Sequence, residues 1–230
     1  MSWVRQMFSN GASPGTPREQ LIRRLGNDGT LSPDAVRAIA AVPREKFVPP
    51  QHAGLAYEDA ALEIGPAATI SAPSMVAAML SVLELKPGMK VLEIGAGSGY
   101  AAAASAVLGA SVVGIELQPE LAEQGRRNLE AAGMADRVVM IAADGTRGWP
   151  DAAPYERILV SAAVEAVPQE WLQQLSQGGM LVYPEAGEGI DLLVRLTKTG
   201  DGFRRQEMGH CRFVRLQVEG GTPPSGPFGW

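Results

Sequence analysis

The sequence predicts an α/β fold: a doubly wound, mostly parallel sheet with an antiparallel edge and an N-terminal helical cap. From residue 88 onward, short apolar runs alternate with helical segments, a pattern typical of a parallel sheet with helices on both faces. Two later apolar runs are joined by a short polar turn, which indicates antiparallel strands at one edge. Before residue 88 the segments are helical or rich in turn residues, so this part should cover the sheet rather than join it.

The alternation after residue 88 places each sheet element in turn. We expect helices at 99–108, 119–132 and 169–175, and parallel strands at 90–94, 111–116, 137–142, 155–161 and 180–183. The antiparallel edge should consist of strands at 190–197 and 211–218, joined by the polar turn 199–202.

The N-terminal region contains helix signals and one broken loop. Ser32 is a typical N-cap and is followed by Pro33 at the first helical position, which predicts a helix to about Ala41 after an earlier helix at 17–25. A further helix is predicted at 74–83 from its apolar spacing. The loop 56–73 is rich in hydroxyls and small residues, and such loops between rigid elements often carry function.

These signals divide the chain into four segments. We expect a partly disordered N-terminal segment at 1–17, and a helical cap with the active-site loop at 18–87. A cofactor-binding sheet domain should follow at 88–218, and then a flexible, Gly- and Pro-rich tail at 219–230.

Composition excludes several classes of function. The net charge is −5, and no Lys/Arg cluster is longer than a pair, so the electrostatic footprint of a nucleic-acid binder is missing. The single Cys211 allows no internal disulfide, and His52 and His210 have no metal-ligand spacing, so we expect no bound metal. No apolar run reaches the ~18 residues that span a bilayer. We therefore expect a soluble, cytoplasmic protein that binds neither nucleic acid nor membranes. Separately from these observations, we expect a monomer.

The stretch from Lys90 to Tyr100, KVLEIGAGSGY, predicts a nucleotide site. A buried strand runs into glycines at 95, 97 and 99, which let the backbone turn sharply beside a ligand, and a helix then begins. The free N–H groups and dipole of that helix end point at the bound molecule. Tyr100 stands where a dinucleotide fingerprint has its third glycine, which argues against NAD.

Two further strand ends support this site. Glu116 ends the next strand, 21 residues after Gly95, and is placed to accept hydrogen bonds from a ribose. Asp144 and Gly145 follow the third strand. A glycine turn alone is weak evidence for any ligand, but three consecutive strand ends facing one crevice make the prediction specific. A mononucleoside with a small charged tail fits best, and S-adenosylmethionine is such a molecule.

On its motifs the chain resembles the protein-L-isoaspartate (D-aspartate) O-methyltransferase family from about residue 43 to residue 216. The glycine motif is common to class I methyltransferases, whereas Thr69-Ile70-Ser71 followed by Ala72-Pro73 is characteristic of this family. Other matching stretches are Pro43-x-x-x-Phe47-Val48-Pro49, Ala56-Tyr57-x-Asp59, Asp144-Gly145-x-x-Gly148-Trp149 and Arg212-Phe213-Val214.

The resemblance implies a Rossmann-like fold and methyl transfer from S-adenosylmethionine to the free carboxylate of L-isoaspartyl or D-aspartyl residues, which starts the repair of damaged proteins. It implies Ser71 as the catalytic residue. It implies cofactor contacts at Ala68, Thr69, Ile70, Glu93, Gly95, Gly97, Ser98, Gly99, Glu116, Asp144 and Gly145. An isoaspartyl carboxylate has a pKa near ~4 and is already a nucleophile at neutral pH, so no general base is required. Ser71 would then orient that carboxylate, the alternative being a serine that only caps its loop.

The sequence also departs from the family pattern. Ala61 and Glu63 stand where prolines are usual, and Ala67 replaces Gly, Asn or Gln. Glu156 replaces an aspartate in the fourth strand, and Arg215 replaces a proline near the C-terminus. The changes near the C-terminus put the identity of the substrate in question more than that of the cofactor. Two alternatives therefore stay open: a methyltransferase acting on another peptide carboxylate, and a non-catalytic module that binds the nucleoside.

Overall fold

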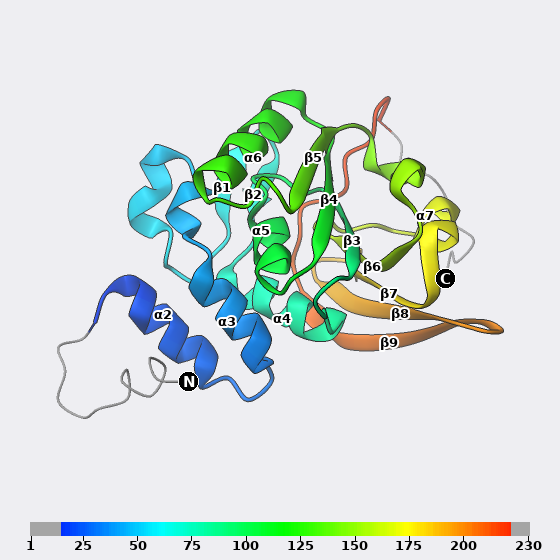
Figure 1. The fold of residues 1–230 in the computed structure, drawn as a ribbon, viewed down its shortest axis with the longest axis horizontal. Coiled ribbons are helices and arrows are strands. Elements are labelled where there is room, and N and C mark those ends of the chain that lie inside the picture. Colours follow the sequence, from blue (N-terminus) through cyan, green and yellow to red (C-terminus); the bar gives the residue numbers. More distant parts are fainter. Residues whose placement is uncertain (1–14, 222–230) are drawn as a thin grey trace.

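A seven-stranded sheet forms the centre of the computed structural model, which describes residues 15–221 (Figure 1). The strand order is β5-β4-β3-β6-β7-β8-β9; pairs among β3 to β7 are parallel, and β8 and β9 add antiparallel neighbours. The strands are β3 (Lys90–Ile94), β4 (Ser111–Glu116), β5 (Val138–Ala142), β6 (Tyr155–Val160), β7 (Leu175–Glu185), β8 (Asp191–Thr199) and β9 (Gly202–Cys211). The predicted mostly parallel sheet with an antiparallel edge is confirmed.

Helices cover both faces of this sheet. On one face lie the three helices α4, α5 and α6, joined by the cap helices α2 and α3, while α7 covers the other face (Figure 1). Their bounds are α2 (Pro17–Gly26), α3 (Pro33–Ala41), α4 (Pro73–Leu83), α5 (Tyr100–Val107), α6 (Pro119–Ala131) and α7 (Gln169–Gln174). Short 3₁₀ helices are η1 (Arg44–Lys46), η2 (Pro50–Leu55), η3 (Gly145–Arg147) and η4 (Pro150–Ala152). Of the segments predicted to be disordered or flexible, 1–17 and 219–230, residues 1–14 and 222–230 lie outside the described residues, while Pro17 already begins α2.

The cap helices begin at the predicted residues, Pro17 and Pro33. The Ser32 hydroxyl accepts a hydrogen bond from the Ala35 N–H, and Pro33 opens α3. Thr16 and Glu19 form a capping box at the start of α2. Because α3 contacts both α4 and α5, the cap is fixed directly against the helices that flank the glycine turn.

The loop predicted at 56–73 contains a small antiparallel hairpin, β1 (Leu62–Gly65) and β2 (Ala68–Ile70). Ala67 sits in its turn with a φ of 50°, in the left-handed region that favours glycine or asparagine. This explains why alanine is a departure from the family pattern there. Strands of four and three residues are too short for alternation to reveal them.

The strand predicted at 211–218 is wrong. β9 occupies Gly202–Cys211, directly after the predicted turn, and is an edge strand with mostly exposed or half-buried residues. Its sequence therefore shows little of the alternation of apolar and polar residues that predicts a strand. The apolar residues Phe213, Val214 and Leu216 belong instead to a segment that crosses the carboxyl ends of the parallel strands, where Val214 and Leu216 hydrogen-bond to Ala163. β7 also begins at Leu175 and not at 180.

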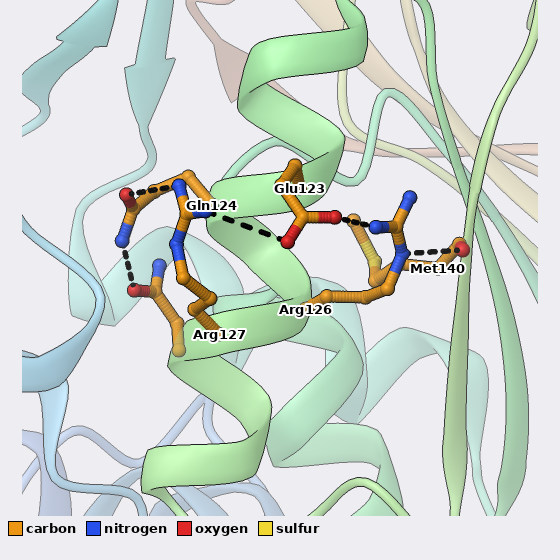
Figure 2. A network of polar contacts seen from close by, with 6 residues as sticks. Glu123, Gln124, Arg126, Arg127 and Met140 are labelled. Carbon is orange, nitrogen blue, oxygen red and sulfur yellow. Dashed lines mark hydrogen bonds and ion pairs between the residues drawn. The ribbon is translucent and has the colours of Figure 1, made fainter.

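Helix α6 joins the glycine turn to the sheet edge. Figure 2 shows its surface network, in which Glu123 pairs with Arg126 and Arg127, and the Arg126 Nε donates to the Met140 carbonyl of β5 at 3.4 Å. Such exposed ion pairs contribute at most about 1 kcal/mol each. Position 125, in the interior of this helix, requires glycine, because a Cβ there would come within 2.9 Å of the Gly97 carbonyl oxygen. The helix can therefore pack closely against the turn.

Arginines from the sheet fix the C-terminal end of α4. The buried Arg157 of β6 donates to the Leu83 carbonyl, and Arg195 of β8 donates to the Val82 carbonyl at 3.2 Å and pairs with Glu84. Positive side chains at the C-terminal end of a helix also interact favourably with the helix dipole. At the other end, the Asp59 carboxylate accepts from the Ser74 N–H at 2.9 Å. Since Ser71 comes just before α4, these contacts fix the backbone that carries it.

Candidate active site

Two adjoining cavities open at the carboxyl ends of β3, β4 and β6, where the strand order of the parallel sheet reverses. Ligands of open α/β sheets bind at such a switch point. The first cavity encloses about 550 Å³ of space, open solvent included, and the second about 360 Å³. The residues lining both are Ile64, Thr69, Gly95, Gly97 and Ser161.

The glycine turn after β3 forms the floor shared by the cavities. Gly95, Gly97 and Gly99 have φ values of 73°, 54° and 84°, which other residues adopt only with strain. A Cβ on Gly97 would also approach the Ile64 side chain to 3.1 Å. Gly99 lines neither cavity: it precedes α5, and a Cβ there would meet Leu129. Gly99 was predicted to contact the cofactor, but it is not part of either cavity wall.

Glu116, the last residue of β4, lines the first cavity and is 8% exposed. Its two carboxylate oxygens accept from the Gly97 N–H and the Gln118 N–H, each at 3.0 Å. The carboxylate thus orders the glycine turn. It also has lone pairs left for two donors of a ligand, because each carboxylate oxygen accepts more than one hydrogen bond.

Glu93 lies in the second cavity as a fully buried carboxyl group. The Ser161 hydroxyl donates to its Oε1 at 2.9 Å, while Oε2 has no partner within the described chain. Burial raises the pKa of Glu93 to about 8, against the opposite effect of the Ser161 hydrogen bond. An unpaired, buried acceptor in a cavity wall suits a cationic group of a ligand.

Ser71 lines the second cavity, together with Ile70 and Ser98. Its hydroxyl has no hydrogen-bond partner among residues 15–221, so it is free to meet a ligand. Thr69 lies between the two cavities, and Ala68 lines the first. The hairpin and the start of α4 therefore bring the hydroxyl-rich loop to the glycine turn, as the family resemblance implied.

Gly145 and Asp144, at the end of β5, differ in their placement. Gly145 lines the first cavity, where a Cβ would come within 2.7 Å of Ile94. Asp144 does not line it. Although partial burial acts to raise the pKa of the Asp144 carboxyl, hydrogen bonds from Thr146 and from the Glu219 N–H outweigh this effect and hold the pKa below its usual range.

Sequence reasoning missed one wall of the first cavity, the segment from Val214 to Gln217. Gln217 donates to the Ala67 carbonyl at 3.5 Å, which ties this segment to the hairpin. Arg215 pairs with the nearly buried Asp191 at 2.6 Å. The chain pairs with Ala163 through the Val214 carbonyl and the Leu216 N–H, and not through the N–H of residue 215. A proline is therefore compatible with position 215, as the family pattern suggests.

The wall also includes Ser161 and Ala162, which directly follow β6, and Gln118, which follows β4. The rule that strand ends line the crevice could have found these three residues. Among residues 15–221, no group of three or more His, Cys, Asp or Glu side chains could hold a metal ion. Over the same range, no helix has the length and apolarity needed to cross a membrane.

The cavities match a nucleoside with an amino-acid tail. The first offers a carboxylate and glycine backbone, which suit a ribose and a ring. The second offers the unpaired Glu93 oxygen, which suits an ammonium group. S-adenosylmethionine has these parts in this order, so the residues present fit that cofactor.

Comparison with known proteins agrees with this geometry. The family model for protein-L-isoaspartate(D-aspartate) O-methyltransferase matches residues 16–220. A protein-L-isoaspartate O-methyltransferase of Hyperthermus butylicus is 46% identical over 225 residues, 93% of this chain and 90% of that protein. One of Methylorubrum populi is 46% identical over 198 residues, 86% of this chain and 91% of that protein.

Solved structures show the same fold. A protein-L-isoaspartate O-methyltransferase structure has a TM-score of 0.79 at 30% identity; the match covers 87% of this chain and 66% of that one. A Plasmodium falciparum protein assigned to the same methyltransferase, in complex with S-adenosyl-L-homocysteine, has a TM-score of 0.77 at 23% identity, covering 86% of this chain and 97% of that one. From the family model and the relatives at 46% identity, the chain belongs to the protein-L-isoaspartate (D-aspartate) O-methyltransferase family.

Proposed function

We propose that this protein transfers a methyl group from S-adenosylmethionine to the free carboxylate of L-isoaspartyl or D-aspartyl residues in proteins. The observation that carries the proposal is the free Ser71 hydroxyl in the wall of a cavity that also contains the glycine turn and Glu93. The family to which the chain belongs and the fit of its residues to the cofactor support the same conclusion.

The residues of the first cavity would bind the nucleoside. Glu116 would accept hydrogen bonds from the two ribose hydroxyls, and the backbone of Gly95 and Gly97 would lie against the ribose and tail. Gly145 would contact the adenine, with Asp144 at its edge. The C-terminal wall, Val214 to Gln217, would cover the site and exclude water.

The acceptor needs little chemical help from the protein. When bound, S-adenosylmethionine supplies an electrophilic methyl group on a sulfonium. The acceptor carboxylate is ionised at neutral pH, since its pKa is near ~4, so it would attack the methyl carbon without losing a proton. The methyl–sulfur bond would break as the new carbon–oxygen bond forms, and its electron pair would leave with the neutral thioether, S-adenosylhomocysteine. Ser71 would donate a hydrogen bond to one carboxylate oxygen so that the other faces the methyl group. Such positioning can supply up to ~7–11 kcal/mol of the barrier.

A base-lability assay tests the reaction class. Purified protein, methyl-labelled S-adenosylmethionine and an isoaspartyl peptide should give a labelled peptide that releases labelled methanol in mild base, because a methyl ester hydrolyses there. Label that stays on the peptide would indicate transfer to nitrogen or a hydroxyl group and would contradict the proposal. We further propose that the protein works in the cytoplasm as a monomer on isoaspartyl-containing proteins.

A further inference from the structure

The turn of the β1–β2 hairpin accepts side-chain hydrogen bonds from two other parts of the chain. Gln118, which follows β4, donates from its side-chain Nε2 to the Pro66 carbonyl at 3.0 Å. Gln217, from the C-terminal segment, donates from its Nε2 to the Ala67 carbonyl at 3.5 Å. Two glutamines from distant parts of the chain therefore hold two successive carbonyls of one turn, and we call these contacts the two glutamine bonds.

The two glutamine bonds connect three segments that line the first cavity. The hairpin lines it from Ala67 to Thr69, the C-terminal segment from Val214 to Gln217, and the loop after β4 through Gln118. The Gln118 N–H also donates to the Glu116 carboxylate at 3.0 Å, so one residue contacts both the proposed ribose acceptor and the hairpin turn. A nucleoside in this cavity would lie between walls that these bonds join.

The hairpin depends on contacts with the rest of the protein. Its strands have four and three residues, and an isolated two-stranded hairpin is marginally stable in water. At its base the side chains of Leu62 and Ile70 pair and are buried, whereas Pro66 and Ala67 at the turn are exposed. The turn is therefore the end of the hairpin that can move away from the cavity when the two glutamine bonds break.

We propose that Gln118 and Gln217 are positioning residues that hold the hairpin over the bound cofactor, and that the cofactor leaves when their bonds to the turn open. This inference rests on the placement of the nucleoside in the proposed function. Both bonds are neutral and lie at the surface, so each contributes little free energy and can open repeatedly. Because β2 leads directly to Ser71, an open hairpin would also displace the hydroxyl assigned to the acceptor.

The variant Gln118→Met removes the donor and keeps the length of the side chain. A chase of bound, labelled S-adenosylhomocysteine with excess unlabelled ligand measures the release rate. We expect release to be about two- to ten-fold faster than in the wild type, as for one lost neutral hydrogen bond. Gln217→Met should have a smaller effect because its bond is longer, at 3.5 Å. The melting temperature without ligand should change little in either variant, because both bonds lie at the surface.

Gln20→Met is the matched control. The Gln20 Nε2 donates to the Gly15 carbonyl at 2.9 Å, which is the same kind of bond, and Gln20 lines neither cavity. This variant should release the ligand at the rate of the wild type.

Hydrogen exchange distinguishes a bond that holds the hairpin from a direct contact between Gln118 and the ligand. With saturating S-adenosylhomocysteine, the amides of residues 62–71 should exchange faster in Gln118→Met than in the wild type. The amides of the glycine turn, residues 95–99, should exchange equally in both. Faster release with unchanged exchange at residues 62–71 would assign the Gln118 side chain to the ligand itself and overturn the inference.

Two outcomes separate this inference from the proposed function. If the wild type binds S-adenosylhomocysteine and both variants release it at the wild-type rate, the inference alone is wrong. If the wild type does not bind S-adenosylhomocysteine, the cofactor site of the proposed function is wrong, and this inference with it.

Discussion

Replacing Glu116 by alanine tests the nucleoside site most sharply. Its carboxylate is 8% exposed and holds the Gly97 and Gln118 N–H groups at 3.0 Å each. In Glu116→Ala these donors and the two ribose hydroxyls lose a charged acceptor. A hydrogen bond to a charged group contributes about 1.5–3 kcal/mol, and water entering the cavity compensates part of the loss. We therefore expect binding to weaken by about 1–3 kcal/mol, or roughly 5- to 150-fold in Kd.

Titration calorimetry with S-adenosylhomocysteine measures this change directly. Glu130→Ala is the control, because it removes the same charge from an exposed position on α6 that lines neither cavity. The control should bind as the wild type does. An unchanged Kd in Glu116→Ala, with the protein folded, would refute the assignment of the ribose to Glu116.

Three other substitutions test separate parts of the account. Ser71→Ala should lower kcat about 10- to 100-fold while the Kd for S-adenosylhomocysteine stays constant, since the lost hydrogen bond goes to the acceptor; full activity would leave Ser71 a structural role only. Gly125→Ala should weaken nucleoside binding although Gly125 lines neither cavity, because its new methyl group would push against the Gly97 carbonyl; calorimetry showing equal binding would contradict this coupling. Burial raises the pKa of Glu93 to about 8 from an ordinary 4.5, so the folded protein holds this proton longer and loses stability as pH rises through that window. The melting temperature of Glu93→Gln relative to wild type should therefore increase from about pH 5 to about pH 8.5, and a constant difference would contradict a buried, titrating Glu93.

The parallel part of the fold and its nucleoside site could be predicted because local patterns determine them. Apolar runs define the strands, and the carboxyl ends of parallel strands always meet at one edge. That rule alone brings Gly95, Glu116 and Gly145 into one cavity. Asp144 and Gly99 could not be separated from these residues by sequence, because only the folded structure shows that neither lines a cavity.

The missed features depend on contacts between distant segments. The wall from Val214 to Gln217 has apolar residues like a strand, but pairing with Ala163 and the ion pair to Asp191 draw it across the strand ends. β9 lies at the edge of the sheet, where most of its residues are exposed or half-buried, so its sequence lacks the alternation of apolar residues that predicts a strand. The contact of Arg44 with the Tyr100 ring likewise forms only when the cap packs against the sheet domain, so no local sequence pattern predicts it.

The central claim is that the acceptor is an isoaspartyl carboxylate, and two peptides of one sequence test it most directly. One peptide carries L-isoaspartate at a single position and its twin carries ordinary L-aspartate there. With saturating S-adenosylmethionine, we predict rapid methylation of the isoaspartyl peptide and no detectable methylation of the twin. Equal rates on both peptides, or none on either from a protein that binds the cofactor, would contradict the claim.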